Sequence, residues 1–270
     1  KLEFQNDSDR KRASFQIEKF CRTYQSNSPL TTCILRDLNI QIKNFPTRMV
    51  LDSEVDPRNV PSLERSDGRI LTICSVGYKP GSGIDKLPKT VKSYNYLLKE
   101  DTNESLEHDV LLPFLKEAFN YSCLMGFYSA KFDVPYTQIW ISRLKIGWDF
   151  DFVTVFDAHN IYTVLNTNNW DSRKFNLESI AQNEFSEGKE KIEDYQVLWD
   201  YWVNNDPRLV SYCLQDADLI RRIDEKWNAI DSRLVATNLT NVRPDAYIAY
   251  LQGIEAITVK KLNHRNPPEV

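Results

Sequence analysis

The sequence predicts an α/β or α+β sheet domain that covers about residues 46–230 of the 270-residue chain. Short apolar runs, some with the alternation of half-buried strands, come between longer segments in which apolar residues recur with helical spacing. The composition is that of an ordinary globular domain, since 41% of the residues are hydrophobic and 27% are charged. A chain of this length can bury a substantial core as one large domain or two small ones.

The first predicted elements are mostly strands. Partial alternation over Thr31–Ile42 predicts a half-buried strand, and Met49–Leu51 is an apolar run that leads into an acidic pair. Arg69–Tyr78 is the strongest strand candidate, because it is rich in β-formers and ends at a Gly/Pro/Ser turn. A mobile connection is expected to follow, before helical spacing over Leu106–Asn120.

The middle of the chain continues the alternation of strands and helices. Tyr121–Phe127 is predicted to be a buried strand and Tyr136–Leu144 a helix. Phe152–Phe156 is predicted to be a short strand, and Ala158–Leu165 to begin the next helix.

Three further helices are expected toward the C-terminus. Asn176–Phe185 has a possible N-cap in Asn176 and an acidic residue in its first turn. Arg208–Trp227 is a long helix with an apolar stripe that consists of Leu209, Tyr212, Cys213, Leu219 and Ile223. Pro244 begins a last helix that runs to about Leu262.

Composition and charge exclude several classes of protein. With only 8 Gly and 12 Pro, the chain is neither collagen-like nor of low complexity. No apolar run approaches the roughly 18 residues of a membrane span. The charged segment Lys1–Arg12 is not followed by an apolar stretch, so no signal peptide is visible. We therefore expect an intracellular protein, cytoplasmic in a prokaryote, without a membrane partner.

The charge is unevenly distributed along the chain. Residues 1–45 carry 8 basic and 5 acidic side chains, whereas residues 46–270 carry 26 basic and 33 acidic ones. A protein that coats duplex nucleic acid is expected to be basic. The acidic part is compatible with a carboxylate metal site, where nucleic acid is held locally through cations.

The cysteines predict reduced thiols. They are odd in number, and no two form a Cys-x-x-Cys pair: Cys21, Cys33, Cys74, Cys123 and Cys213. A disulfide framework or a zinc site is therefore not expected.

The first candidate for chemistry is the pair Asp52 and Glu54. On an extended strand, residues i and i+2 point to the same face. Two adjacent carboxylates repel each other unless a cation neutralises them, and Mg²⁺ and Mn²⁺ prefer such oxygen ligands. Acidic pairs are also common on surfaces without any metal, so this pair alone is weak evidence.

Two more acidic positions stand out. Asp133 follows a strand and a turn and is surrounded in sequence by apolar residues, either as the N-cap of a helix with Pro135 in its first turn or as a metal ligand. Tyr212 and Asp216 lie four residues apart and so share one helical face, whereas Asp218 faces elsewhere. The alternative for this last pair is a core tyrosine beside an exposed aspartate.

These acidic residues lie in three motifs that follow one another along the chain, VLDSEVDP, KFDVPY and SYCLQDADL. In this order they resemble the three motifs of the proofreading 3′→5′ exonuclease domain of family B DNA polymerases, of the DEDD type with a tyrosine. NLESIAQNEFSEGKEKI resembles the segment between the second and third motifs of that family, and the flanks resemble archaeal members. The resemblance covers about residues 40–270. It implies a ribonuclease H-like mixed sheet flanked by helices.

The resemblance also implies a site. Four carboxylates would bind two divalent ions, Mg²⁺ or Mn²⁺, and Tyr212 would orient the attacking water; the ligands are Asp52, Glu54, Asp133 and Asp216. The substrate would be the 3′ end of single-stranded DNA. Bases would stack on nearby aromatic side chains, with Phe127, Tyr128 and Phe132 as candidates.

Two departures from the family concern the surroundings of the ligands. The family usually has an Asn where this chain has Tyr128, and an apolar residue where it has Ser53. A catalytically weakened domain that serves as a structural or DNA-binding module is therefore an alternative. A free-standing nuclease that acts on RNA, and an unrelated binding protein, are weaker alternatives.

The polymerase motifs of the family are missing from the chain. We expect residues 1–45 to be an N-terminal extension or a remnant of the polymerase N-terminal domain, and residues 46–230 to be the exonuclease domain. Residues 231–270 would be a helical segment that leads toward a palm domain. The palm and thumb, in the parent protein or on a separate chain, would then be its partners.

Overall fold

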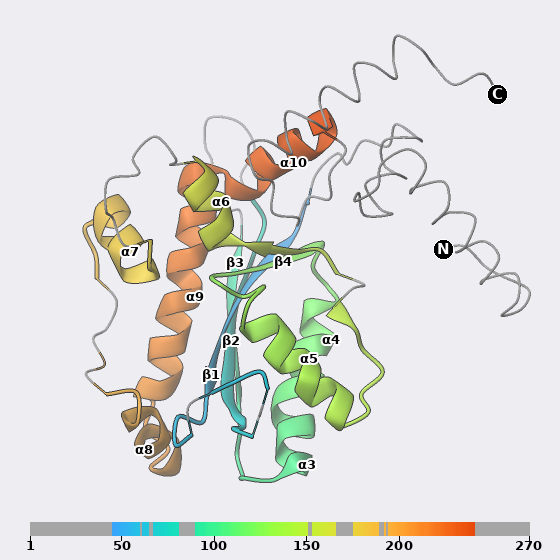
Figure 1. Ribbon diagram of the computed structural model, residues 1–270, viewed down its shortest axis with the longest axis vertical. Helices are drawn as coiled ribbons and strands as arrows, with labels where there is room; N and C mark the ends of the chain where they lie inside the picture. Colours follow the sequence, from blue (N-terminus) through green and yellow to red (C-terminus); the bar gives the residue numbers. More distant parts are fainter. Residues whose placement is uncertain are drawn as a thin grey trace, which may run out of the picture. The chain divides into compact units, whose positions relative to one another are not determined.

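The computed structural model describes residues 45–59, 61–64, 67–80, 90–150, 153–165, 175–188, 192 and 194–240. Within these ranges the chain forms a five-stranded mixed sheet flanked by helices (Figure 1). In the sheet order β3-β2-β1-β4-β5, the strands are β1 (Arg48–Val55), β2 (Ile70–Tyr78), β3 (Val91–Leu97), β4 (Cys123–Gly126) and β5 (Val155–Asp157). The predicted α/β class with a mixed sheet between helices is confirmed.

The central strand β1 is paired over its full length on one side only. It runs antiparallel to β2, and Asp52 lies opposite Cys74 in the register. On its other side it runs parallel to β4, but that pairing covers only Arg48–Val50. The C-terminal half of β1, which carries Asp52 and Glu54, therefore extends beyond the β4 pairing.

Helices cover both faces of the sheet. The helices of the described residues are α3 (Asn103–Ser105), the π-helical turn η1 (Leu106–Leu111), α4 (Leu112–Ala118), α5 (Asp133–Arg143), α6 (Ala158–Leu165), α7 (Leu177–Phe185), α8 (Val197–Val203), α9 (Arg208–Trp227) and α10 (Ala229–Thr240). Helix α9 runs along one face, against β1 and β2, while α4 and α5 lie on the opposite side (Figure 1). Residues Asn44–Asp231 form one compact unit. No helix in the described ranges has the length and apolarity needed to cross a membrane.

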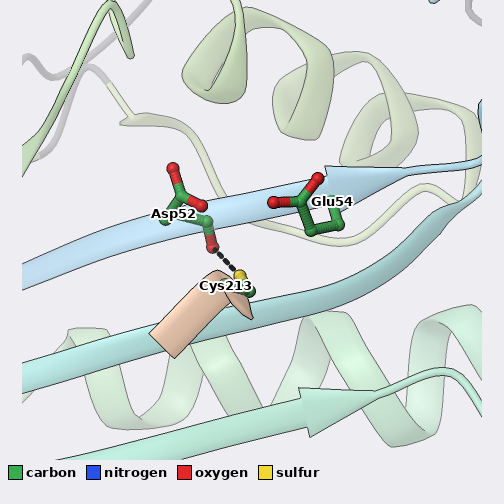
Figure 2. A group of neighbouring side chains, drawn as sticks. All are labelled: Asp52, Glu54 and Cys213. Atoms are coloured by element: carbon green, nitrogen blue, oxygen red, sulfur yellow. Dashed lines mark hydrogen bonds between the residues drawn. The ribbon is translucent and has the colours of Figure 1, made fainter. Parts of the chain in front are cut away.

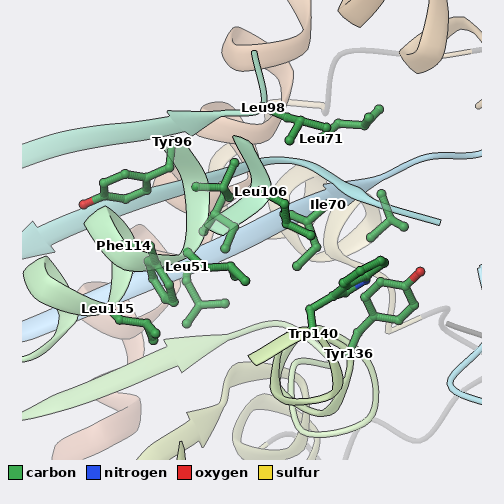
Figure 3. Close-up of a cluster of buried hydrophobic side chains, with 14 of the residues drawn as sticks. Leu51, Ile70, Leu71, Tyr96, Leu98, Leu106, Phe114, Leu115, Tyr136 and Trp140 are labelled. Carbon is green, nitrogen blue, oxygen red and sulfur yellow. The ribbon is translucent and has the colours of Figure 1, made fainter. Parts of the chain in front are cut away.

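Successive side chains of β1 point alternately to the two faces of the sheet. Leu51 packs with Phe114 of α4 and Trp140 of α5 in the main apolar cluster (Figure 3). Arg48 points to the other face, where it pairs with Asp224 of α9. Burial of large side chains such as Phe114 is worth about 1.5–3 kcal/mol each, so this cluster holds β1 rigidly in place.

Most predicted elements are confirmed with small shifts of their ends. The strand predicted over Arg69–Tyr78 is β2, and the helices predicted over Ala158–Leu165 and Arg208–Trp227 are α6 and α9. The predicted N-cap is also confirmed, because the Asn176 side chain accepts a hydrogen bond from the Ser179 amide at 2.8 Å. All five residues of the apolar stripe on α9 are buried.

The mobile connection expected after β2 contains strand β3, so that expectation is wrong for Val91–Leu97. The strand lies at the edge of the sheet and is largely exposed, so its sequence lacks the apolar pattern of a buried strand. Helix α8 was not expected either. The strand predicted over Thr31–Ile42 and the helix predicted from Pro244 lie outside the described residues.

Candidate active site

Two of the predicted ligands meet on β1. Asp52 and Glu54 lie on the face covered by α9, and oxygen atoms of both carboxylates lie within 4.8 Å of each other and of the Cys213 sulfur (Figure 2). Glu54 is buried and Asp52 is half-buried. Two carboxylates that are this close and largely removed from water favour a cation between them.

The donor set of this group fits an oxygen-preferring ion. The Cys213 thiol donates a hydrogen bond to the backbone oxygen of Asp52, with a sulfur–oxygen distance of 3.4 Å. Burial raises the pKa of Cys213 well above its usual value, so this thiol stays protonated at neutral pH. Two carboxylates beside a neutral thiol suit Mg²⁺ or Mn²⁺ better than a thiolate-preferring metal.

Helix α9 brings the other two residues of its motif to the same face. Tyr212 and Asp216 are both buried one turn apart. The pKa of Tyr212 is raised above its usual value, first by burial and then by the negative charges of Glu54 and Asp216. The phenol thus lies near Glu54 and Asp216. Asp218 turns away, as expected, and pairs with Arg221 at 2.7 Å.

Asp133 takes a different position. It is the first residue of α5, and Phe132 holds the N-cap position, so the prediction of Asp133 as the cap is wrong by one residue. The Ser53 hydroxyl donates a hydrogen bond of 2.5 Å to the Asp133 carboxylate. Because Ser53 alternates with Asp52 and Glu54, this contact lies on the opposite side of β1. Asp133 is not part of the group that Asp52, Glu54 and Cys213 form in the described chain.

Asp157, at the end of β5, positions the loop that leads to Asp133. Its carboxylate accepts hydrogen bonds from four backbone amides, those of Tyr128, Ala130, His159 and Asn160, at 3.0–3.3 Å. Sequence reasoning missed this residue. The signal available was an acidic residue directly between a buried strand and a helix, which is typical of an N-terminal cap.

The three aromatic residues predicted to bind DNA lie in or beside this loop. Tyr128 is 38% exposed and stacks on His159 with ring centroids 3.9 Å apart, while the Lys131 ammonium lies 5.0 Å from the Tyr128 ring. Phe127 and Phe132 are half-buried. The backbone of Tyr128 has φ 57°, a left-handed conformation that suits Asn better than Tyr.

Burial raises the pKa of Asp133 to about 6. The hydrogen bond from Ser53 lowers this pKa, but its effect is smaller than that of burial. Since an unfolded aspartate has a pKa of about 3.9, ionisation of the folded form is unfavourable, and stability should fall as the pH rises from about 4 to about 6. Without metal, we expect Asp133→Asn to stabilise the protein by about 2–3 kcal/mol at pH 7.5 and by little at pH 4.

Urea unfolding in EDTA at several pH values measures this effect. Asp200→Asn, on an exposed site of α8, is the matched control and should leave the pH dependence unchanged. The same pH dependence in Asp133→Asn and in the wild type would contradict the expected burial cost.

No protein-family model matches the chain, and a search of curated proteins finds no significant match either. The family resemblance therefore rests on the sequence motifs alone.

Proposed function

We propose that this chain is a metal-dependent 3′→5′ exonuclease of ribonuclease H-like fold, similar to the proofreading domain of family B DNA polymerases. One observation carries the proposal: Asp52 and Glu54 on β1 lie beside Cys213 of α9, the helix that also carries Tyr212 and Asp216, and the charges of Glu54 and Asp216 both act on Tyr212. The order of these residues along the chain is the order of the DEDD motifs. A five-stranded mixed sheet between helices is compatible with the fold.

The roles of the residues follow from their chemistry. Asp52 and Glu54, together with Asp216, would hold Mg²⁺ or Mn²⁺, and Asp133 would join them as a ligand of a second ion once its hydrogen bond to Ser53 is released. When bound, such ions supply hydroxide at neutral pH and stabilise the charge on a leaving 3′ oxygen. Tyr212 is a poor base near neutrality because its raised pKa keeps the phenol protonated, so it orients the attacking water by hydrogen bonding.

Substrate binding would use the exposed ring of Tyr128, with Phe127 and Phe132 beside it. Base–aromatic stacking is worth about 1–3 kcal/mol per base and tolerates any sequence, as removal of arbitrary 3′ nucleotides requires. The product would be a 5′-mononucleotide released from single-stranded DNA. A palm and thumb domain, in the same protein or on another chain, would deliver the primer end.

A second candidate function is a weakened exonuclease-like domain that binds DNA. The observation in its favour is the Ser53 hydroxyl bound to Asp133, which holds this ligand on the far side of β1. If Asp133 stays bound to Ser53, it is not available as a ligand beside Asp52 and Glu54. Such a domain would hold fewer ions and would bind DNA with little cleavage.

A cleavage assay separates the two functions. A 5′-labelled single-stranded oligonucleotide is incubated with the protein and Mn²⁺ or Mg²⁺, with EDTA in a parallel reaction. A ladder that shortens from the 3′ end and is absent in EDTA supports the exonuclease. An uncut oligonucleotide that shifts in a native gel supports the binding module, and an oligonucleotide that is neither cut nor bound contradicts both.

A further inference from the structure

Three aromatic rings and a lysine gather at the loop that leads to Asp133. The rings of Tyr128 and His159 stack, with centroids 3.9 Å apart and an interplanar angle of 23°. Phe127 meets each of these two rings edge-on, with centroid distances of 5.4 Å. The Lys131 ammonium lies 5.0 Å from the centroid of the Tyr128 ring. His159 lies outside the three sequence motifs, and the function proposed above gives no role to it or to Lys131.

The cluster lies at the carboxyl ends of parallel strands. Phe127 and Tyr128 directly follow β4, and His159 is the second residue after β5. Strand β1 also runs parallel to β4, so its C-terminal half, with Asp52 and Glu54, points to the same edge of the sheet. In open α/β sheets, ligands bind outside the carboxyl ends of the parallel strands. This topology therefore places the ring cluster and the acidic pair along one edge.

One buried carboxylate anchors the backbone on both sides of the stack. Asp157 accepts hydrogen bonds from the Tyr128 amide at 3.2 Å and from the His159 amide at 3.0 Å. Tyr128 has a left-handed φ of 57°, which is unfavourable for a residue with a large side chain. Its side chain is nevertheless exposed and adds little to the core. A strained, anchored and exposed aromatic residue is typical of a ligand contact rather than of core packing.

We propose that Tyr128, His159 and Lys131 form a subsite for one nucleotide of single-stranded DNA. The base stacks on the Tyr128 ring, which His159 supports from its other face, and Lys131 binds the adjoining phosphate. This inference rests on the DNA substrate of the proposed function and deepens it, because it assigns two further binding residues.

The protonation states of the two basic groups agree with these roles. Burial lowers the pKa of His159 below its usual value, so the imidazole is neutral at pH 7.5 and supplies a flat ring rather than a cation. Lys131 is exposed and carries the positive charge that a phosphate requires.

A binding assay tests the stack without any cleavage. The Kd of a fluorescently labelled single-stranded oligonucleotide is measured by anisotropy in EDTA. We expect His159→Ala to raise Kd about 3- to 10-fold, the value of one aromatic pair, and His159→Phe to leave it within about twofold, because a phenyl ring also supports Tyr128. In the Tyr128→Ala background, His159→Ala should have no further effect, since the ring that it supports is gone.

The salt dependence of binding tests the phosphate contact. Each neutralised phosphate of a single strand contributes about 0.7 to the slope of log K against log salt, so the slope for Lys131→Met should be about 0.7 less steep. Lys92→Met is the matched control. Lys92 is also exposed, but it lies on β3, at the opposite edge of the sheet from β5, so its slope should equal that of the wild type.

The outcomes separate the subsite from the proposed function. If the wild type binds the oligonucleotide but does not cleave it with Mn²⁺, the exonuclease function is overturned, and the variants still decide the subsite. If the wild type neither binds nor cleaves, both are overturned. If it binds, three results each overturn the subsite: an unchanged Kd in His159→Ala, an equal loss in both Tyr128 backgrounds, or equal slopes for Lys131→Met and Lys92→Met. Should His159→Ala fail to fold, the slope of the exposed Lys131→Met decides.

Discussion

Replacement of Asp52 with asparagine is expected to slow 3′-terminal cleavage by about 100- to 1,000-fold. The amide has nearly the shape of the carboxylate but lacks its charge, so the ion that Glu54 shares with it would bind more weakly. Stabilisation of a transition state by a metal ion is worth several kcal/mol, and each 1.36 kcal/mol is a factor of ten in rate. Asp52 is half-buried on the part of β1 that extends beyond the β4 pairing, and asparagine has nearly the same volume, so the fold should tolerate the change.

Initial cleavage rates at saturating Mn²⁺ measure the effect of Asp52→Asn. Asp218→Asn is the matched control, because Asp218 also lies near the site on α9 but pairs with Arg221. Its rate should stay within about twofold of the wild type. A second readout is the melting temperature, which Mn²⁺ should raise in the wild type and in Asp218→Asn but not in Asp52→Asn. An equal rate loss in both variants would mean that the acidic pair holds no catalytic ion.

Replacement of Arg48 with methionine is expected to lower the free energy of unfolding by about 3–5 kcal/mol. Arg48 is almost fully buried and pairs with Asp224 at 2.7 Å and with Asp231 at 2.5 Å. Asp224 also accepts hydrogen bonds from the Tyr78 hydroxyl and the Ile230 amide. Without Arg48, a buried carboxylate between β1 and α9 loses its opposite charge.

Urea unfolding of Arg48→Met, monitored by circular dichroism, measures the loss. Arg208→Met is the matched control, since Arg208 pairs with Asp206 at 2.6 Å but has a side chain that is 58% exposed. An exposed pair of this kind is worth about 0–1 kcal/mol. The double variant Arg48→Met with Asp224→Leu should recover part of the loss, because neither charge remains buried. Similar small effects of the two methionine substitutions would show that Arg48 does not hold α9 to the sheet.

The pairs within each element could be predicted from the sequence. The period of two residues in a strand puts Asp52 and Glu54 on one face, and the period of 3.6 in a helix does the same for Tyr212 and Asp216. The cap at Asn176 is equally local, because a capping side chain binds an amide three residues away.

Contacts between distant segments decided the rest of the site. The hydrogen bond from Ser53 to Asp133 joins residues 80 positions apart, and the resulting burial raises the pKa of the carboxyl. Asp157 binds the amides of a loop that precedes it by almost 30 residues. Strand β3 is formed by pairing with β2 and shows little apolar pattern of its own.

The sequence by itself therefore determined most of the elements, though not β3 or α8, and the pairs of acidic and phenolic groups on β1 and α9. Only the tertiary structure decided that the β1 pair faces α9 and that Asp133 binds Ser53. Periodicity and capping act over a few residues and leave a pattern in the chain. The meeting of two faces depends on the packing of the whole core, which no short segment of sequence records.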